Sequence, residues 1–163
     1  MPIIDGQLGG QAKDQSGQVI ALTPVQVLQL KGPVVPATLS VPNSVRDALV
    51  KASKPVPAAI QGLALIDTGA QQTCVDQEQV HKMLGLQPNG TGQSHGVGGP
   101  TTHPTFGCML QIHQAGIHPL IFLPKAMGVA LAPHGYIALL GRDFLANKIL
   151  IYSGNTGTYH LTW

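Results

Sequence analysis

Apolar residues in this chain fall into short runs separated by glycine, proline and other turn-forming residues. This pattern is typical of short β-strands joined by tight turns. Alternating apolar and polar positions predict a strand over residues 19–30, and Pro36 places the following strand at a sheet edge or beside a bulge. We expect strands over residues 19–30, 34–41, 58–66, 73–75, 108–113, 120–123, 136–140, 149–152 and 158–163. The last two are expected to form a hairpin.

Helical signals are confined to three short segments. Ser44 and Asp47 fit a capping box at the start of one segment, and Asp76 is placed to cap the next, which Gly85 would end. We expect helices over residues 45–52, 77–84 and 142–147. Residues 1–18 are predicted to be a loose terminus or a peripheral hairpin, and residues 124–135 a long loop.

Composition narrows the class of protein. A chain of 163 residues is the size of one domain. With 44% hydrophobic and 10% charged residues, it is neither a disordered chain nor one that coats nucleic acid. The net charge of +2 is too small to indicate phosphate binding, and 4% aromatic residues leave no stacking platform for bases. We therefore expect no nucleic-acid partner.

Cysteines and histidines give no sign of a disulfide framework or a metal site. Cys74 and Cys108 are expected to be buried free thiols. None of the seven histidines has the spacing of a zinc site, so we expect no metal and no cofactor. The sequence lacks a membrane-length apolar run and a basic-then-apolar leader, so we expect a soluble cytoplasmic protein without membrane contact.

Candidate chemistry centres on the stretch from Gly62 to Ala70, Gly-Leu-Ala-Leu-Ile-Asp-Thr-Gly-Ala. An apolar run typical of a buried strand ends there in Asp67. A lone carboxylate costs several kcal/mol to bury, so a charge at this position indicates a functional requirement. Gly69 then allows close approach by a ligand.

Three motifs resemble those of the retropepsin-like, single-domain aspartic proteases. Asp67-Thr68-Gly69, followed by alanine, is similar to the active-site signature of that family. The downstream stretch Ala-Leu-Leu-Gly-Arg-Asp-Phe-Leu at 138–145 resembles its hydrophobic-hydrophobic-glycine element and arginine-containing helix. Gly-Val-Gly-Gly at 96–99, between the two, resembles the tip of the flap that covers substrate. The motifs occur in the family's order, and the resemblance covers residues 60–163.

This resemblance implies an all-β, retropepsin-like acid protease barrel with two or three short helices. The protease domain would span residues 32–163, with an insertion at 42–57 and a flap at about 93–106, and residues 1–31 would be an N-terminal extension. The C-terminal hairpin over 149–163 is well suited to the shared sheet that joins two subunits in the viral enzymes.

The implied activity is that of an aspartic endopeptidase acting on polypeptide substrates. Such enzymes need two carboxylates that share one proton, which is established for aspartic proteases as a class. The sequence contains one Asp-Thr-Gly and no Asp-Ser-Gly. A homodimer, with one Asp67 from each subunit, is therefore required. The alternatives are a non-catalytic dimerisation or peptide-binding module with the same fold, and a metal-dependent hydrolase that uses the histidines.

The resemblance also implies supporting roles at the active site. Thr68 would bond across the two-fold axis, and Gly69 would admit the substrate backbone. Ala70 offers no side-chain hydrogen bond to the carboxylates, so we expect a mildly acidic rather than strongly acidic optimum. Arg142 resembles the family's structural arginine, but Gln71 stands where viral enzymes commonly have its aspartate partner.

Substrate contacts are implied at the flap and at apolar pockets. Gly96, Val97, Gly98 and Gly99 would form the mobile flap tip, although an ordinary glycine-rich turn has the same composition. Leu65, Ile137 and Leu139 would line pockets for apolar side chains, or serve only as core residues.

Overall fold

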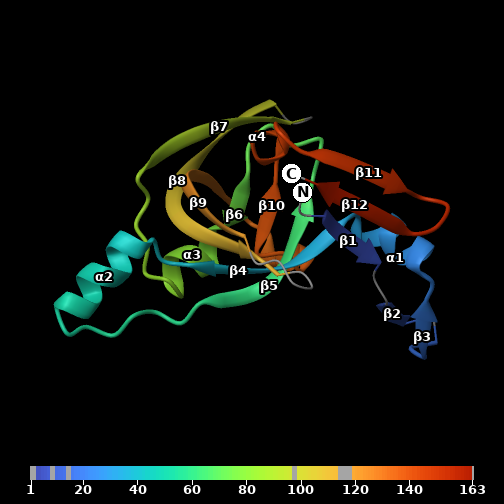
Figure 1. Ribbon diagram of the computed structural model, residues 1–163, viewed down its shortest axis with the longest axis horizontal. Helices are drawn as coiled ribbons and strands as arrows, with labels where there is room; N and C mark the ends of the chain where they lie inside the picture. The colour runs from blue at the N-terminus through green and yellow to red at the C-terminus, as the bar shows by residue number, and fades with distance from the viewer. Residues whose placement is uncertain (1–2, 8–9, 14–15, 97–98, 114–118, 163) are drawn as a thin grey trace.

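The computed structural model describes residues 3–7, 10–13, 16–96, 99–113 and 119–162. Strands account for 49% of the structure and helices for 21%. The expectation of a mostly β fold with a few short helices is therefore confirmed. Figure 1 shows the strands wrapped around a central core, with the helices at its periphery.

Seven strands form one large mixed sheet in the order β4-β5-β10-β6-β9-β8-β7. They are β4 (Val34–Ser40), β5 (Ile60–Ile66), β6 (Cys74–Asp76), β7 (Gly90–Gly96), β8 (Gly99–Ile112), β9 (Leu120–Val129) and β10 (Ala138–Leu140). Strand β10 runs parallel to β5, and β6 runs parallel to β9. A further pairing of β4 with β8 closes the sheet on itself and leaves β7 outside the ring. This closure makes the sheet barrel-like.

A second sheet joins the two ends of the described chain. It has the order β1-β12-β11, with β1 (Ile3–Gln7), β11 (Ile149–Ser153) and β12 (Thr158–Thr162). Strands β11 and β12 form the expected C-terminal hairpin, and β1 pairs with the other edge of β12. A separate hairpin consists of β2 (Gly10–Lys13) and β3 (Val19–Leu22). Both edges of β12 are thus occupied within one chain.

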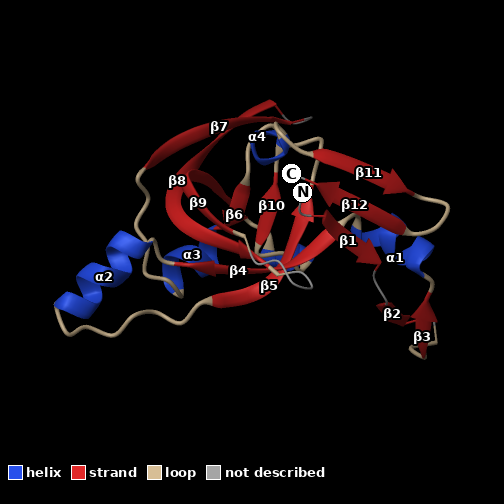
Figure 2. Cartoon of the chain, in the orientation of Figure 1, coloured by secondary structure: helices blue, strands red, loops and turns tan. Residues whose placement is uncertain are grey.

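The described residues form four α-helices and one 3-10 helix, which lie around the sheets (Figure 2). They are α1 (Pro24–Lys31), α2 (Asn43–Lys51), α3 (Gln77–Lys82), η1 (Ala132–His134) and α4 (Arg142–Leu145). Helix α2 projects away from the barrel in Figure 1, and none of its residues is buried. Helix α4 follows β10 directly and leads toward β11, so it connects the barrel to the terminal sheet.

The core fills the barrel with aliphatic side chains from β4, β8 and β10, among them Leu39, Leu110 and Leu140. Tyr159 of β12 is the largest fully buried side chain. Its hydroxyl donates a hydrogen bond to the Val34 carbonyl, which satisfies the one polar group of an otherwise apolar contact. Residues from both sheets therefore share one core.

The predicted strand over residues 19–30 is wrong in its second half, which is helix α1. Thr23 Oγ1 accepts a hydrogen bond from the Gln26 N–H, Gln26 Oε1 accepts one from the Thr23 N–H, and Pro24 occupies the first turn. This capping box outweighs the local alternation. The helix buries Val27 and Leu28.

Two other local predictions are wrong. Helix α2 begins at Asn43 after Pro42, with no side-chain cap, so the Ser44–Asp47 capping box is not formed. Residues 124–129 continue strand β9 instead of forming a loop. Pro124 is accommodated there because β8 and β9 shift register between Phe106 and Cys108, where a ladder hydrogen bond is not needed.

Candidate active site

Asp67 lies in a tight turn at the carboxyl end of β5. Its backbone N–H donates to the Leu140 carbonyl at 3.0 Å, which fixes the turn to the end of the parallel strand β10. The Asp67 carbonyl accepts from the Ala70 N–H at 3.3 Å, which closes the turn. The carboxylate is partly exposed, and its Oδ1 accepts from the Gly69 N–H at 2.8 Å. The fold thus fixes the Asp67 carboxylate in position where strands β5 and β10 end.

The absence of a side chain at Gly69 leaves room for the Asp67 carboxylate. A Cβ at this position would lie 3.0 Å from Asp67 Oδ1, closer than nearly all real Cβ contacts. Any larger residue would push the carboxylate away or break its hydrogen bond to the backbone. The glycine therefore sets the direction of the Asp67 side chain.

Arg142 holds the outer side of the same turn. Its Nη1 donates to the Thr68 carbonyl at 2.9 Å and to the Gly69 carbonyl at 3.0 Å, and its backbone N–H donates to the Ala70 carbonyl at 2.9 Å. The sequence-based interpretation of Arg142 as a support for the turn fits this placement. The Arg142 guanidinium thus bonds backbone carbonyls. Gln71 takes part through its backbone carbonyl, which accepts from the Asp143 N–H at 3.2 Å.

Asp143 supports the far end of the turn, and sequence reasoning missed it. Its carboxylate accepts from the Thr73 N–H at 3.0 Å and from Thr73 Oγ1 at 2.7 Å. Thr73 is only 2% exposed, and its Oγ1 in turn accepts from the Gly141 N–H at 3.2 Å. A Cβ on Gly141 would lie 2.5 Å from the Gln72 carbonyl carbon, so the two segments meet backbone to backbone. An acid directly after Arg142, at a helix start, was the available signal.

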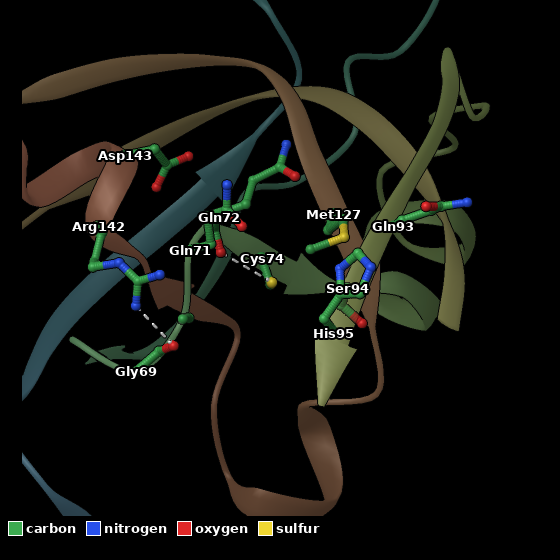
Figure 3. Close-up of a pocket in the computed structure, with 11 residues that line it drawn as sticks. Gly69, Gln71, Gln72, Cys74, Gln93, Ser94, His95, Met127, Arg142 and Asp143 are labelled. Atoms are coloured by element: carbon green, nitrogen blue, oxygen red, sulfur yellow. Dashed lines mark hydrogen bonds between the residues drawn. The ribbon is translucent and has the colours of Figure 1, made fainter. Parts of the chain in front are cut away.

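A cavity of about 470 Å³ adjoins this turn (Figure 3). It is lined by Gly69, Ala70, Gln71, Gln72, Cys74, Gln93, Ser94, His95, Met127, Arg142 and Asp143. Figure 3 shows Cys74 between Arg142 at one end of the cavity and His95 at the other. The cavity therefore extends from the Asp67 turn to strand β7.

Strands β7 and β8 form the antiparallel hairpin expected of the flap, with Gly96 paired to Gly99 at its end. The predicted tip residues Val97 and Gly98 lie outside the described residues. Gln93, Ser94 and His95 bring β7 to the cavity wall. The hairpin and the Asp67 turn thus face the same space.

The three apolar residues predicted to contact substrate do not line this cavity. Ile137 is 5% exposed and belongs to the main core, where it packs against Gly62. Leu139 is half-buried and packs with Cys74 and Met127, which do line the cavity. Leu65 is also half-buried. The glutamines that line the cavity were not predicted, because the flap resemblance brings residues 93–106 to the active site without indicating which of its side chains line it.

The two cysteines are free and buried, as expected. Burial, with the negative charges of Asp143 and Asp67, raises the pKa of the Cys74 thiol to about 11, and burial raises the pKa of Cys108 to about 12. The Cys74 thiol is therefore protonated at neutral pH and is a poor nucleophile. Cysteine-protease chemistry does not fit this cavity.

No group of three or more potential metal ligands gathers within the described part of the chain. Among its histidines, His103 contacts Ser94 Oγ at 2.9 Å and His113 contacts Thr38 Oγ1 at 2.6 Å. None of the helices in the described ranges has the length and apolar character needed to cross a membrane. No protein-family model and no curated protein sequence matches this chain.

Proposed function

We propose that this protein is a retropepsin-like aspartic endopeptidase that is active as a homodimer. The observation that carries the proposal is the Asp67 turn. A partly exposed carboxylate is fixed by backbone hydrogen bonds and by Arg142, beside a cavity that a β-hairpin borders. Both the sequence motif and the geometry of its surroundings support the assignment.

The proposed chemistry follows from two Asp67 carboxyl groups that share one proton. The ionised carboxylate takes a proton from a bound water as the water oxygen attacks the scissile carbonyl carbon. The protonated carboxyl donates a hydrogen bond to the carbonyl oxygen, where negative charge develops. A proton then passes to the leaving amine as the C–N bond breaks, which regenerates the shared-proton pair.

A second copy is needed because the chain supplies one Asp-Thr-Gly motif. We place the subunit contact at β11, an edge strand of the terminal sheet. Ile149 and Ile151, both on β11, are 60% and 54% exposed. An edge strand with exposed aliphatic side chains offers unpaired backbone groups and apolar surface to a partner. Helix α4, which begins with Arg142 and Asp143, is followed by β11, so such a contact would lie close in sequence to the residues that support the Asp67 turn.

The test is cleavage of an unfolded protein substrate between about pH 4 and 7. Asp67→Asn keeps an oxygen that can accept from the Gly69 N–H, so the turn is expected to persist while turnover is lost. Asp47→Asn is the matched control, because Asp47 is exposed and pairs only with its neighbour Arg46 on α2.

We expect cleavage by the wild type and by Asp47→Asn, and at least a 1,000-fold loss in Asp67→Asn, on the order of the losses seen when one member of a catalytic unit is removed. Equal cleavage by all three proteins would show that Asp67 is not the catalytic group. A folded dimer without turnover in any of them would support the dimerisation or peptide-binding module instead.

A further inference from the structure

The cavity beside Asp67 has both polar and apolar walls. Three carboxamide residues line it, Gln71 and Gln72 from the segment after the Asp67 turn and Gln93 from β7. Ser94 and His95 add a hydroxyl and an imidazole from the same strand. Ala70, Cys74 and Met127 contribute apolar side chains.

Several of these polar groups are available to a ligand. Gln71, Gln93 and His95 are exposed, and their side chains have no hydrogen-bond partner among the described residues. Gln72 commits its Nε2 to the Lys125 carbonyl at 2.9 Å. A carboxamide both donates and accepts, so this arrangement matches a ligand group that can do the same.

The charged residues at the cavity are engaged with the backbone. Arg142 donates to the carbonyls of Thr68 and Gly69, and the Asp143 carboxylate accepts three hydrogen bonds, two of them from Thr73. The two residues also carry opposite charges next to each other. Because the two charges offset each other, the cavity gives a ligand group of either sign little net attraction.

We infer that this cavity is a specificity subsite for an uncharged, hydrogen-bonding substrate side chain, glutamine or asparagine above all, and not for an aliphatic one. The inference rests on the proposed protease function and deepens it. Gln71 lines the cavity from the segment after the Asp67 turn and Gln93 from β7, so both carboxamides could bond such a side chain, while Cys74 and Met127 would contact its methylene carbons. An aliphatic side chain would cover the glutamines and leave their polar groups unpaired, which disfavours it.

The test compares peptides that differ at one position only. Fluorogenic peptides are made with glutamine, methionine or glutamate at each position flanking the cleaved bond, because these three side chains have nearly the same shape. At one position, we expect kcat/KM for glutamine to exceed the values for methionine and glutamate by about 5- to 10-fold, the range expected from one or two net hydrogen bonds.

Variants then assign the preference to the cavity. In the double variant Gln71→Leu/Gln93→Leu, the ratio of glutamine to methionine is expected to fall to about 1 or below. Gln87→Leu is the control, because Gln87 is an exposed glutamine outside the cavity, and its ratio should match the wild type. Methionine preferred at every position, or an unchanged ratio in the double variant, would overturn the inference and leave the protease function standing.

Binding of the same peptides to Asp67→Asn, followed by fluorescence anisotropy, separates this inference from the proposed function. Glutamine-selective binding without cleavage by the wild type would retain the subsite and reject the protease. Cleavage with no selectivity would do the reverse. Neither cleavage nor selective binding would reject both.

Discussion

Arg142 and Asp143 are adjacent residues that hold opposite ends of the segment carrying Asp67. Arg142 bonds the carbonyls of Thr68 and Gly69, and Asp143 bonds the backbone and hydroxyl of Thr73. Helix α4 therefore fixes both ends of this segment through its first two residues. The direction of the Asp67 carboxylate depends on these contacts as well as on Gly69.

Replacing Asp143 by alanine should loosen this segment, because Asp143 supports it through Thr73. The buried Thr73 N–H and hydroxyl would lose their acceptor, which we expect to cost about 2 kcal/mol of unfolding free energy. We expect kcat to fall by at least 10-fold with little change in KM, because the carboxylates would be misaligned while the cavity remains. Chemical denaturation and steady-state kinetics measure the two effects.

Asp143→Asn is the control for that prediction, because the amide oxygen can still accept one hydrogen bond from Thr73. It should recover part of the lost kcat. If Asp143→Ala lowers stability but leaves kcat unchanged, Asp143 does not position the Asp67 turn.

Sequence reasoning at the residue scale found the residues that motifs mark and missed those that only proximity assembles. Asp67, Gly69 and Arg142 were predicted, and Gly69 bonds both of the others, through its N–H to Asp67 and through its carbonyl to Arg142. Asp143 was missed because its place at a helix start, directly after Arg142, does not indicate which distant backbone its carboxylate binds. Its partner Thr73 lies 70 residues away along the chain.

At the scale of elements, Asp76 joins helix α3 to the segment that precedes β10. Its Oδ1 accepts from the Gln79 N–H at 2.9 Å, which is the helix cap predicted from the sequence. Its Oδ2 accepts from the N–H groups of Leu131 and Ala132 at 2.8 and 2.7 Å, which the sequence did not indicate. One side chain, 1% exposed, thus satisfies three backbone donors from two elements.

Asp76→Ala should lower the free energy of unfolding by about 3 kcal/mol, since it removes a helix cap and leaves two further N–H groups without their acceptor. Urea denaturation of this variant and of Asp47→Ala measures the effect. Asp47 is exposed on α2, so its replacement should change stability by less than about 0.5 kcal/mol. Similar losses in both variants would contradict the bridging role of Asp76.

Element types were predictable where hydrophobic runs were long and bounded by turn residues, as in β5 and the β11–β12 hairpin. They failed where local side-chain chemistry competed with periodicity, as at Thr23 and Gln26, which turn an alternating stretch into α1. They also failed at Pro124, because the register shift that tolerates a proline within β9 depends on the facing strand β8. At Pro124, the pairing of two strands therefore determines the secondary structure, and local sequence does not.

At the scale of the whole molecule, the pairing of the terminal sheet limits where the proposed second copy could add a strand. Strand β12 is paired on both edges within its own chain, by β1 and β11. The free edges of this sheet are therefore those of β1 and β11. Strand β11 carries the exposed aliphatic residues Ile149 and Ile151, and it follows α4 closely in sequence. A β11 contact would thus couple dimer formation to the segment that supports Asp67.

Ile151→Lys places a charge on the exposed face of β11, where charged side chains block edge-to-edge association. Because Ile151 is 54% exposed, each chain should still fold, but we expect it to be monomeric at low micromolar concentration. Specific activity should then fall at least 10-fold and recover as the enzyme concentration is raised, because the active site needs two chains. Val50→Lys, at an exposed apolar position on α2, should remain dimeric and active. Sedimentation velocity and activity across a concentration series measure both properties. An Ile151→Lys protein that stays dimeric and fully active would place the subunit contact elsewhere, and an active monomer would remove the requirement for a second Asp67.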